Sequence, residues 1–256
     1  MYVVAYLLIS VLVFYRLRTE AWAITKDDVI SLLVWSIVGL AIGGRIGYAL
    51  FYDSATFVQN PLLLIWPFER TATGGLTLVG ISGLSYHGAL IGIVVSSLLY
   101  CWKHRHVRPL DVADLFFPAI PLGYAFGRLG NFINGELYGR ATSVPWAMIF
   151  PADPLHFPRH PSQLYEAFLE GIVMFVILWP LRKRKWFRGW TLPAYLFLYA
   201  VARITVEWYR EPDPQLGFVL GPFTMGQILS SIMVIASIVL FVILFRRERR
   251  SSPGPT

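Results

Sequence analysis

Residues 114 to 140 read DLFFPAIPLGYAFGRLGNFINGELYGR, an apolar run that leads directly into a stretch crowded with hydrogen-bonding groups. The last fourteen of these residues, from Gly127, hold two Arg, two Asn, one Glu and four Gly. In a membrane protein, polar and irregular backbone is tolerated only where it is buried in protein or lines a watery cavity. The stretch therefore predicts a cavity at the end of a membrane-spanning segment.

The composition of the whole chain agrees with a membrane protein. Of its 256 residues, 56% are hydrophobic and 14% are charged, against about 25% charged in an average soluble domain. The net charge of +7 is carried by short basic clusters, each at the end of an apolar run. Membrane topology explains that pattern, so we predict a lipid bilayer and not a nucleic acid as the partner.

Apolar segments recur seven times along the chain. We therefore predict an all-α, polytopic membrane protein of about seven transmembrane helices, as a single domain over residues 1–250 with a disordered cytoplasmic tail at 251–256. The segments cover residues 1–15, 29–51, 84–102, 112–128, 162–181, 191–209 and 223–245.

The basic residues predict the orientation of these helices. The connections after segments 1, 3, 5 and 7 hold 15 of the 22 Lys and Arg residues. Positive charge favours the cytoplasmic side, so the C-terminus is predicted to be cytoplasmic, with the connections after segments 2, 4 and 6 outside.

The first segment is short for a membrane span. Fifteen residues precede Arg16, and at 1.5 Å per residue they cover roughly 22 Å of a hydrocarbon core about 30 Å thick. We expect a truncated first helix or a misplaced start.

The basic residues outside the four cytoplasmic connections are all arginines. A guanidinium group presents a planar fork of donors that suits phosphate or carboxylate, whereas an ammonium group is a point charge. The predicted outer side is therefore suited to an anionic ligand. These residues are Arg45, Arg70, Arg128, Arg140, Arg159, Arg203 and Arg210.

Two of these arginines fall inside apolar segments. Arg45 and Arg203 each need a partner or a wet cavity, because an arginine in the membrane centre costs at least about 2.5 kcal/mol. Glu207 lies four residues after Arg203, so the two side chains share a helix face and can form an ion pair. That pair is either structural or holds Arg203 for a ligand. His87 begins the third segment, either as a hydrogen-bonded structural residue or as a proton acceptor on the outer side.

Glycines and prolines decide the expected backbone of the opening stretch. Pro118 and Pro121 are expected to bend the helix that leads into it. Its four glycines favour irregular backbone over a regular helix. Asn131, Asn134 and Glu136 are expected to satisfy the freed backbone groups, with Arg128 directed at the contents of the cavity. The single cysteine, Cys101, and the scattered histidines offer no metal-ligand set.

At these residues the chain resembles the prolipoprotein diacylglyceryl transferases. GRLGNFINGELYG is very similar to the signature of that family, and further blocks follow the family order along nearly the whole chain. They are GGRIGYALFYD, SYHGALIG, RHPSQLYEA, ARITVEWYREPD and MGQILS.

The resemblance implies a transferase of the bacterial inner membrane, with its active site toward the periplasm and no cofactor or metal. Its substrates would be phosphatidylglycerol and prolipoprotein signal peptides that carry a lipobox cysteine. The implied catalytic residues are His87, Arg128, Glu136, Arg203 and Glu207. The implied substrate-binding residues are Arg45, Tyr48, Arg128, Asn131, Asn134, Gly139 and Tyr199.

The chain departs from the family pattern in two places. A Trp-Tyr-Gly element that usually lies upstream of the position of Met1 is missing, and Ala89 stands where glycine is common. Two other classes of protein are alternatives. One is a transporter or channel, which the lack of an internal repeat disfavours, and the other is a non-catalytic lipid-binding or assembly protein with the same fold.

Overall fold

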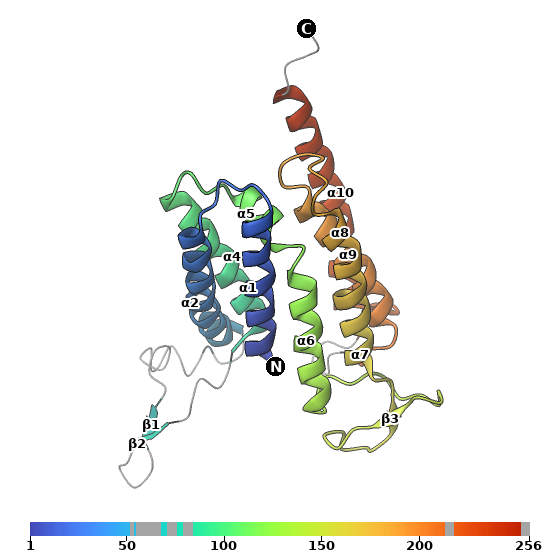
Figure 1. The fold of residues 1–256 in the computed structure, drawn as a ribbon. Helices are drawn as coiled ribbons and strands as arrows, with labels where there is room; N and C mark the ends of the chain where they lie inside the picture. Colours follow the sequence, from blue (N-terminus) through green and yellow to red (C-terminus); the bar gives the residue numbers. More distant parts are fainter. Residues whose placement is uncertain (52–53, 55–67, 71–75, 79–83, 213–217, 252–256) are drawn as a thin grey trace. The chain divides into compact units, whose positions relative to one another are not determined.

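The computed structural model describes residues 1–51, 54, 68–70, 76–78, 84–212 and 218–251, and in these ranges the chain is mostly helical (Figure 1). Every apolar segment predicted from the sequence is helical. The helices are α1 (Tyr2–Thr19), α2 (Lys26–Phe51), α4 (Tyr86–Lys103), α5 (Pro109–Phe116), α6 (Ile120–Ile133), α7 (Ser162–Glu166), the π-helix η2 (Ala167–Val173), α8 (Met174–Leu181), α9 (Thr191–Glu207) and α10 (Met225–Ser251).

Four of these helical stretches are long and apolar enough to cross a membrane: Tyr2–Thr19, Lys26–Leu50, Ser162–Leu181 and Met225–Arg250. A fifth is added if the bent pair α5 and α6 is one span. The chain is therefore a multi-pass membrane protein. The count of seven spans and the side of the C-terminus stay predictions.

The expectation that the first segment is too short for a membrane span was wrong, because α1 continues past Arg16 to Thr19 and is long and apolar enough to cross a membrane. The Arg16 side chain is buried, and its charge is paired with Glu20 at 2.8 Å. It also donates to the backbone carbonyls of Asp114 and Leu115, at 2.5 and 2.7 Å. These contacts allow an arginine inside the helix, which at 18 residues is about 27 Å long.

The predicted bend before the opening stretch is confirmed, since α5 and α6 meet at 58°. The prediction of irregular backbone from Gly127 onward was wrong for its first half. Helix α6 continues through Gly127 and Gly130 to Ile133, and irregular backbone begins at the C-cap residue Asn134. Gly130 packs against Met1, where an added Cβ would lie 2.7 Å from the Met1 Cβ, so close helix packing explains this glycine.

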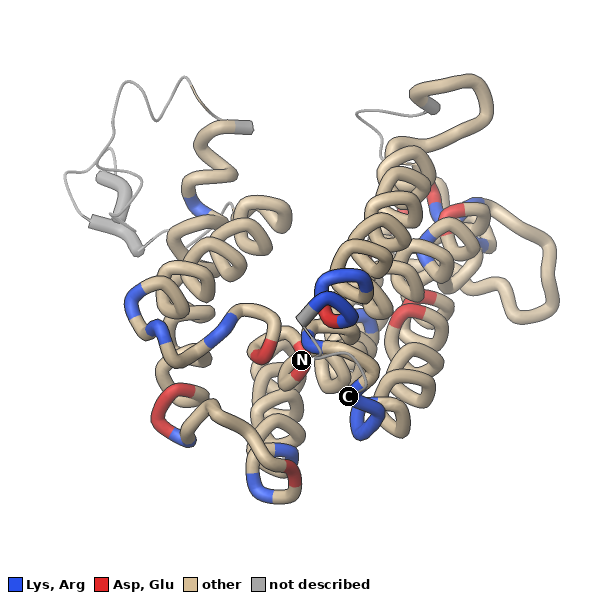
Figure 2. Tube along the Cα trace, turned by 90° about the horizontal axis from the view of Figure 1, so that it is seen from above, with Lys and Arg blue, Asp and Glu red and all other residues tan. Residues whose placement is uncertain are grey.

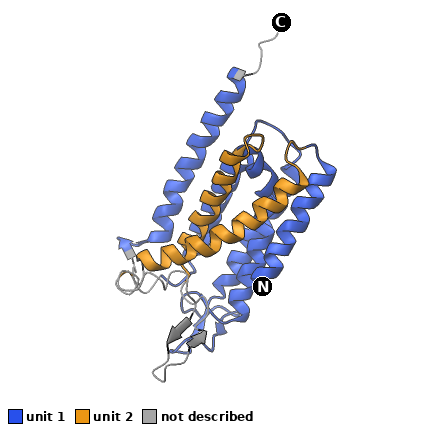
Figure 3. Ribbon diagram, turned by 90° about the vertical axis from the view of Figure 1, so that its left-hand side faces the viewer, with its two compact units in different colours: residues 1–21, 110–256 blue, residues 22–109 orange. Residues whose placement is uncertain are grey.

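The chain forms two compact units, residues 22–109 and residues 1–21 with 110–256 (Figure 3). In the first unit, α2 and α4 pack closely through glycines spaced four apart, Gly39, Gly43 and Gly47 against Gly88 and Gly92. An added Cβ on Gly92 would lie 2.0 Å from the carbonyl oxygen of Gly39. Small residues at this spacing allow two membrane helices to bring their backbones together.

In the second unit, α6 contacts α1 and η2, and α9 contacts η2 and α10. Gly171 of η2 lies against α6, where an added Cβ would be 2.5 Å from the Cβ of Ala125. Near the C-terminal end of α10, Phe187, Trp190 and Leu244 form a buried apolar cluster. Elsewhere the helices expose apolar side chains such as Val11, as expected for contact with lipid.

Three short antiparallel hairpins complete the described structure. They are β1 (Phe68–Arg70) with β2 (Leu76–Leu78), β3 (Met148–Ile149) with β4 (Pro158–Arg159), and β5 (Phe218–Leu220) with β6 (Phe223–Thr224). The disordered tail was predicted at residues 251–256. Ser251 ends α10, and the other residues of the predicted tail lie outside the described residues. In the part of the chain that is coloured by charge, charged residues occupy short stretches between longer uncharged ones (Figure 2).

Candidate functional site

One carboxylate, Glu166, lies at the centre of the site. Its Oε2 atom is 2.8 Å from Nε of Arg128 on α6 and 3.3 Å from Nη1 of Arg203 on α9. Its other oxygen, Oε1, is 3.6 Å from Nη1 of Arg210. Glu166 ends α7 and its side chain is fully buried. A single buried carboxylate therefore gathers three of the outer arginines that the sequence singled out.

Arg203 contacts two more carboxylates. Its Nη2 lies 3.0 Å from Oε2 of Glu207, which confirms the ion pair expected from their spacing on α9. Its Nη1 lies 3.8 Å from Oε1 of Glu170 on η2. Arg203 is thus paired with one carboxylate on its own helix and with another on η2.

Thr224, the last residue of β6, and the start of α10 hold Glu207 in place. The Thr224 hydroxyl donates to Glu207 Oε1 at 3.0 Å. Thr224 and Gln227 also form a reciprocal capping box, in which each side chain accepts from the other's backbone N–H, at 3.3 and 3.1 Å. Gly226 leaves room for the carboxylate, because an added Cβ would lie 2.7 Å from Oε1.

The signature residues form a chain of hydrogen bonds that starts at Arg128. Its Nη1 donates to Asn131 Oδ1 at 3.3 Å, and the amide nitrogen of Asn131 donates to Glu136 Oε1 at 2.8 Å. Asn134 donates to the same Glu136 oxygen at 3.2 Å. Asn131 is buried, whereas Asn134 and Glu136 are exposed. The three predicted residues after Arg128 therefore connect the arginine to the surface of the unit.

Gly139 lies where three backbone segments meet. Its N–H donates to the His160 carbonyl at 2.9 Å, and an isolated β-bridge joins it to Arg210. An added Cβ would be 2.4 Å from the Tyr209 carbonyl oxygen. The neighbouring Arg140 donates to the carbonyl of Arg210 at 2.8 Å. Gly139 thereby fixes the backbone of Arg210, three residues after the end of α9.

An ion pair organises the loop between Gly139 and His160. Arg159 donates to both oxygens of the buried Asp153, at 2.5 and 3.2 Å. These hydrogen bonds hold the pKa of Asp153 below its usual value, although burial acts in the opposite direction. In the same loop, burial lowers the pKa of His160 and so favours the neutral imidazole.

The arginines and carboxylates of the cluster differ in exposure. Glu166 and Glu170 have exposed fractions of 0%, whereas Arg128 and Arg203 are 14% exposed. The acids lie behind the arginines, so a ligand that approaches meets guanidinium groups first. This arrangement suits an anion, and guanidinium groups favour phosphate.

Three of the predicted site residues belong to the unit of residues 22–109. His87 lies exposed in the first turn of α4, with its ring edge-on to Tyr86 at 5.7 Å. Arg45 and Tyr48 lie half-buried on α2. His87 and Tyr48 flank Gly88 and Gly47, the close contact between α4 and α2. These three residues belong to one compact unit, and the arginine cluster belongs to the other.

Sequence reasoning missed two acids and a tyrosine. Glu166 and Glu170 are fully buried ion-pair partners, four residues apart in an apolar segment, and that spacing was the signal that could have revealed them. Tyr124 lies one turn before Arg128, accepts a hydrogen bond from its Nε at 2.8 Å, and is edge-on to Tyr199 at 6.1 Å. No sequence signal distinguishes Tyr124 from a packing residue.

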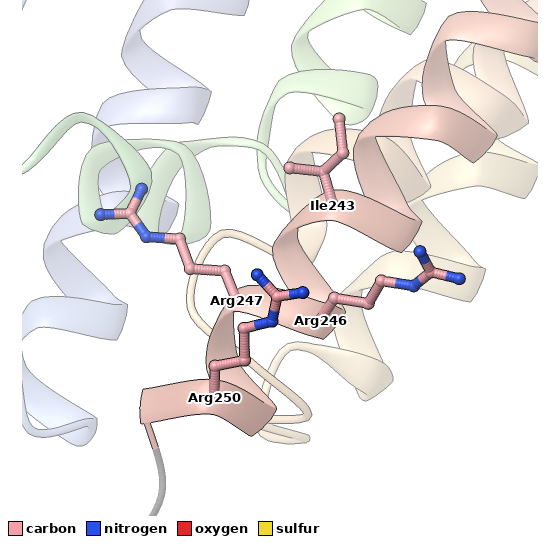
Figure 4. A pocket seen from close by; sticks show the side chains of 4 residues that line it. All are labelled: Ile243, Arg246, Arg247 and Arg250. Carbon is pink, nitrogen blue, oxygen red and sulfur yellow. The ribbon is translucent and has the colours of Figure 1, made fainter.

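A basic hollow of about 340 Å³ lies at the other end of α10, lined by Ile243, Arg246, Arg247 and Arg250 (Figure 4). Twenty residues of helix separate Arg246 from Gly226, which is about 30 Å. The hollow is therefore remote from Glu207 and from the arginine cluster. Its arginines belong to the basic cluster that the sequence predicts on the cytoplasmic side.

Known proteins that are similar to this chain carry the name of one enzyme family. The model of the family described as "Prolipoprotein diacylglyceryl transferase" matches residues 1–243. A phosphatidylglycerol–prolipoprotein diacylglyceryl transferase of Chlorobaculum tepidum is 47% identical over 242 residues, which cover 94% of this chain and 83% of the relative. Enzymes of the same name from Wolinella succinogenes and Coxiella burnetii are 45% and 44% identical, covering 91% and 92% of this chain and 82% and 85% of the relatives. The chain therefore belongs to the prolipoprotein diacylglyceryl transferase family.

Proposed function

We propose that this protein transfers the diacylglyceryl group of phosphatidylglycerol to the thiol of a lipobox cysteine in a prolipoprotein, the first step of lipoprotein maturation. The observation that carries the proposal is the pair of partly exposed arginines, Arg128 and Arg203, held by one buried carboxylate, Glu166. Such a pair can bind a phosphodiester between two guanidinium groups whose positions are fixed in advance.

The reaction forms a bond between the cysteine sulfur and C3 of the glyceryl group, and it breaks the bond from C3 to the phosphate oxygen. Glycerol phosphate leaves with one more negative charge than the phosphodiester carried. Arg128 and Arg203 would stabilise that growing charge, and fixed donors in a site that excludes water do so more strongly than donors in bulk water. No cofactor is required for this displacement.

The thiol must lose its proton before or during the attack. His87 is the proposed acceptor, since imidazole accepts protons near neutral pH. The alternative is a thiol whose ionisation is favoured directly by the neighbouring guanidinium groups, without a dedicated base. A His87→Gln variant separates the two routes: a rate close to wild type from pH 6 to 9 would remove His87 from this role.

The remaining predicted residues are proposed to shape the substrate site. Glu207 would hold Arg203, and Glu136 would act through Asn131 on Arg128. Substrate binding is proposed for Arg45, Tyr48, Asn131, Asn134, Gly139 and Tyr199. We place the protein in the bacterial inner membrane, with this site toward the periplasm and the C-terminus in the cytoplasm, which agrees with the basic connections.

Complementation tests the function. The chain is expressed in a bacterium depleted of its own transferase, and membranes are assayed for transfer from radiolabelled phosphatidylglycerol to a prolipoprotein. Growth and transfer are expected with the wild-type chain, and neither is expected with Arg128→Ala, although that variant still inserts into the membrane. No transfer by the inserted wild-type chain, or full transfer by Arg128→Ala, would count against the proposal. Growth with no lipidated product would point to a binding or assembly role.

A further inference from the structure

Tyr124 joins Arg128 to a second carboxylate in addition to Glu166. Its hydroxyl accepts from Nε of Arg128 at 2.8 Å and donates to Oε2 of Glu170 in a short hydrogen bond. Its ring lies beneath the guanidinium group of Arg128, with 4.9 Å between the guanidinium carbon and the ring centroid. Tyr124 thus contacts Arg128 through both its ring and its hydroxyl.

Glu170 carries the connection on to the second arginine. Its side chain is fully buried on η2, and Oε1 lies 3.8 Å from Nη1 of Arg203. Within the described residues, Oε1 has no hydrogen-bond partner, so the hydrogen bond that this carboxylate accepts is the one from the Tyr124 hydroxyl to Oε2. A path of contacts therefore runs from Arg128 through Tyr124 and Glu170 to Arg203, separate from the bridge that Glu166 makes.

The direction of the Tyr124 hydroxyl matters in this path. A phenol has one proton to donate and can accept through oxygen lone pairs. When that proton points to Glu170, a lone pair is available to Nε of Arg128. Glu166 Oε2 is a competing acceptor at 3.3 Å, and it already serves both arginines. Glu170 therefore keeps the Tyr124 proton away from the carboxylate that the arginines share.

We propose that Tyr124 and Glu170 are positioning residues that hold the Arg128 guanidinium group in the orientation required by the lipid phosphate. The inference rests on the proposed function. The simpler alternative is that Tyr124 fills the core beside Tyr199 and that its hydroxyl is merely satisfied. The two explanations differ in the effect that they predict when the Tyr124 hydroxyl is removed and the ring is kept: the proposal predicts slower transfer, and the alternative predicts no change.

The test uses Tyr124→Phe, Glu170→Gln and the double variant of the full chain, assayed with phosphatidylglycerol in mixed micelles and a prolipoprotein. Each single change is expected to lower kcat/KM for phosphatidylglycerol by about tenfold, because a small displacement of a catalytic group has effects of that size. KM for the prolipoprotein is expected to stay unchanged. The double variant is expected to be no worse than the poorer single variant, because both changes break one path.

The proposal would be overturned if the losses in kcat/KM of the two single variants multiplied in the double variant, or if Tyr124→Phe had the kinetics of wild type. Tyr15→Phe is the matched control, since Tyr15 stacks on Trp179 through its ring and is half exposed, and its kinetics should equal those of wild type. If the phenylalanine variant does not fold, 3,5-difluorotyrosine is placed at position 124. Fluorine leaves the ring in place but makes the hydroxyl a poorer acceptor, so kcat/KM should fall while the unfolding temperature is retained.

Failure of the proposed function is recognised separately. A wild-type chain that transfers no diacylglyceryl group contradicts the function without testing the path through Tyr124. The path is then tested by the binding of phosphatidylglycerol in nanodiscs, for which Tyr124→Phe should bind several-fold more weakly than wild type and Tyr15→Phe equally well. Equal affinities for wild type and Tyr124→Phe would overturn it.

Discussion

Nε of Arg128 lies 2.8 Å from Oε2 of Glu166, and this carboxylate has no exposed surface. The same oxygen is 3.3 Å from Nη1 of Arg203, so one buried atom sets the separation of the two arginines. A buried carboxylate is desolvated at high cost and is stable only while its cations are present. The cations in turn keep a fixed geometry without a ligand, which is the condition for strong electrostatic catalysis.

Replacement of Glu166 by Gln should therefore affect both stability and transfer. Three arginines lose their common counter-ion, and removal of one partner from a buried pair destabilises by about 3 to 5 kcal/mol. Thermal unfolding in detergent should show a lower midpoint, and transfer from phosphatidylglycerol should fall by at least about tenfold.

Glu211→Gln is the control for this change. Glu211 also faces an arginine, Arg159, at 3.1 Å, but its side chain is 45% exposed. Exposed pairs contribute about 0 to 1 kcal/mol, so this variant should unfold close to wild type. If Glu166→Gln matched the control in both assays, the shared carboxylate would have no role in holding the arginines.

The sequence predicted the helices well because apolar periodicity and length determine them locally. All seven predicted segments are helical, and the bend between α5 and α6 follows from Pro118 and Pro121. The sequence also singled out Asn131, Asn134 and Glu136, but the expectation that they satisfy freed backbone groups was wrong. Within the described residues their side chains hydrogen-bond to Arg128, to Tyr2 and to one another.

The rest depended on contacts between segments far apart in the chain. Glu166 and Glu170 look like isolated acids until α7 and η2 pack against α6 and α9, which bring the arginines to them. The glycines of α6 were misinterpreted as turn formers, because in sequence a glycine needed for close helix packing looks the same as one needed for irregular backbone. The continuation of α1 through Arg16 likewise depends on carbonyl groups of residues about a hundred positions away.

The packing of α2 on α4 predicts opposite effects for two neighbouring glycines. A Cβ on Gly43 would lie 2.4 Å from the Gly88 carbonyl oxygen. A Cβ on Gly44 would instead meet the flexible end of Leu84 at 3.0 Å, and its next contact, the Cβ of Ala89 at 3.5 Å, is an ordinary one. Both changes to Ala gain the same helix propensity, up to about 1 kcal/mol. Gly43→Ala should lower the unfolding midpoint and Gly44→Ala should not. A midpoint for Gly43→Ala at or above wild type would show that these helices do not pack through their backbones.

The Asp153–Arg159 pair predicts a pH dependence of the loop from Gly139 to His160. Because the pKa of Asp153 is lowered in the folded state, its contribution to stability is fully present above the usual value of about 3.9 and is lost as pH falls through the lowered pKa. Limited proteolysis in detergent with an acid-tolerant protease should find the loop protected at pH 5 and cleaved only at more acidic pH. In Asp153→Asn the loop should be cleaved at pH 5 as well, and equal protection of the variant and wild type would contradict the role of the pair.

The fit of Gly226 against Glu207 predicts that a substitution on α10 disturbs Arg203, which lies on α9. An alanine Cβ at this position would lie 2.7 Å from Oε1 of Glu207 and would push the carboxylate away from Arg203, its partner at 3.0 Å. Gly226→Ala is therefore expected to lower both the unfolding midpoint and the rate of transfer. Gly127→Ala is the control for stability, because its Cβ would meet only Tyr2 at 3.7 Å, an ordinary contact, and should not lower the midpoint. A loss of transfer in Gly226→Ala with an unchanged midpoint would locate the effect in the position of Glu207 alone, whereas unchanged values of both would mean that α10 does not hold this carboxylate.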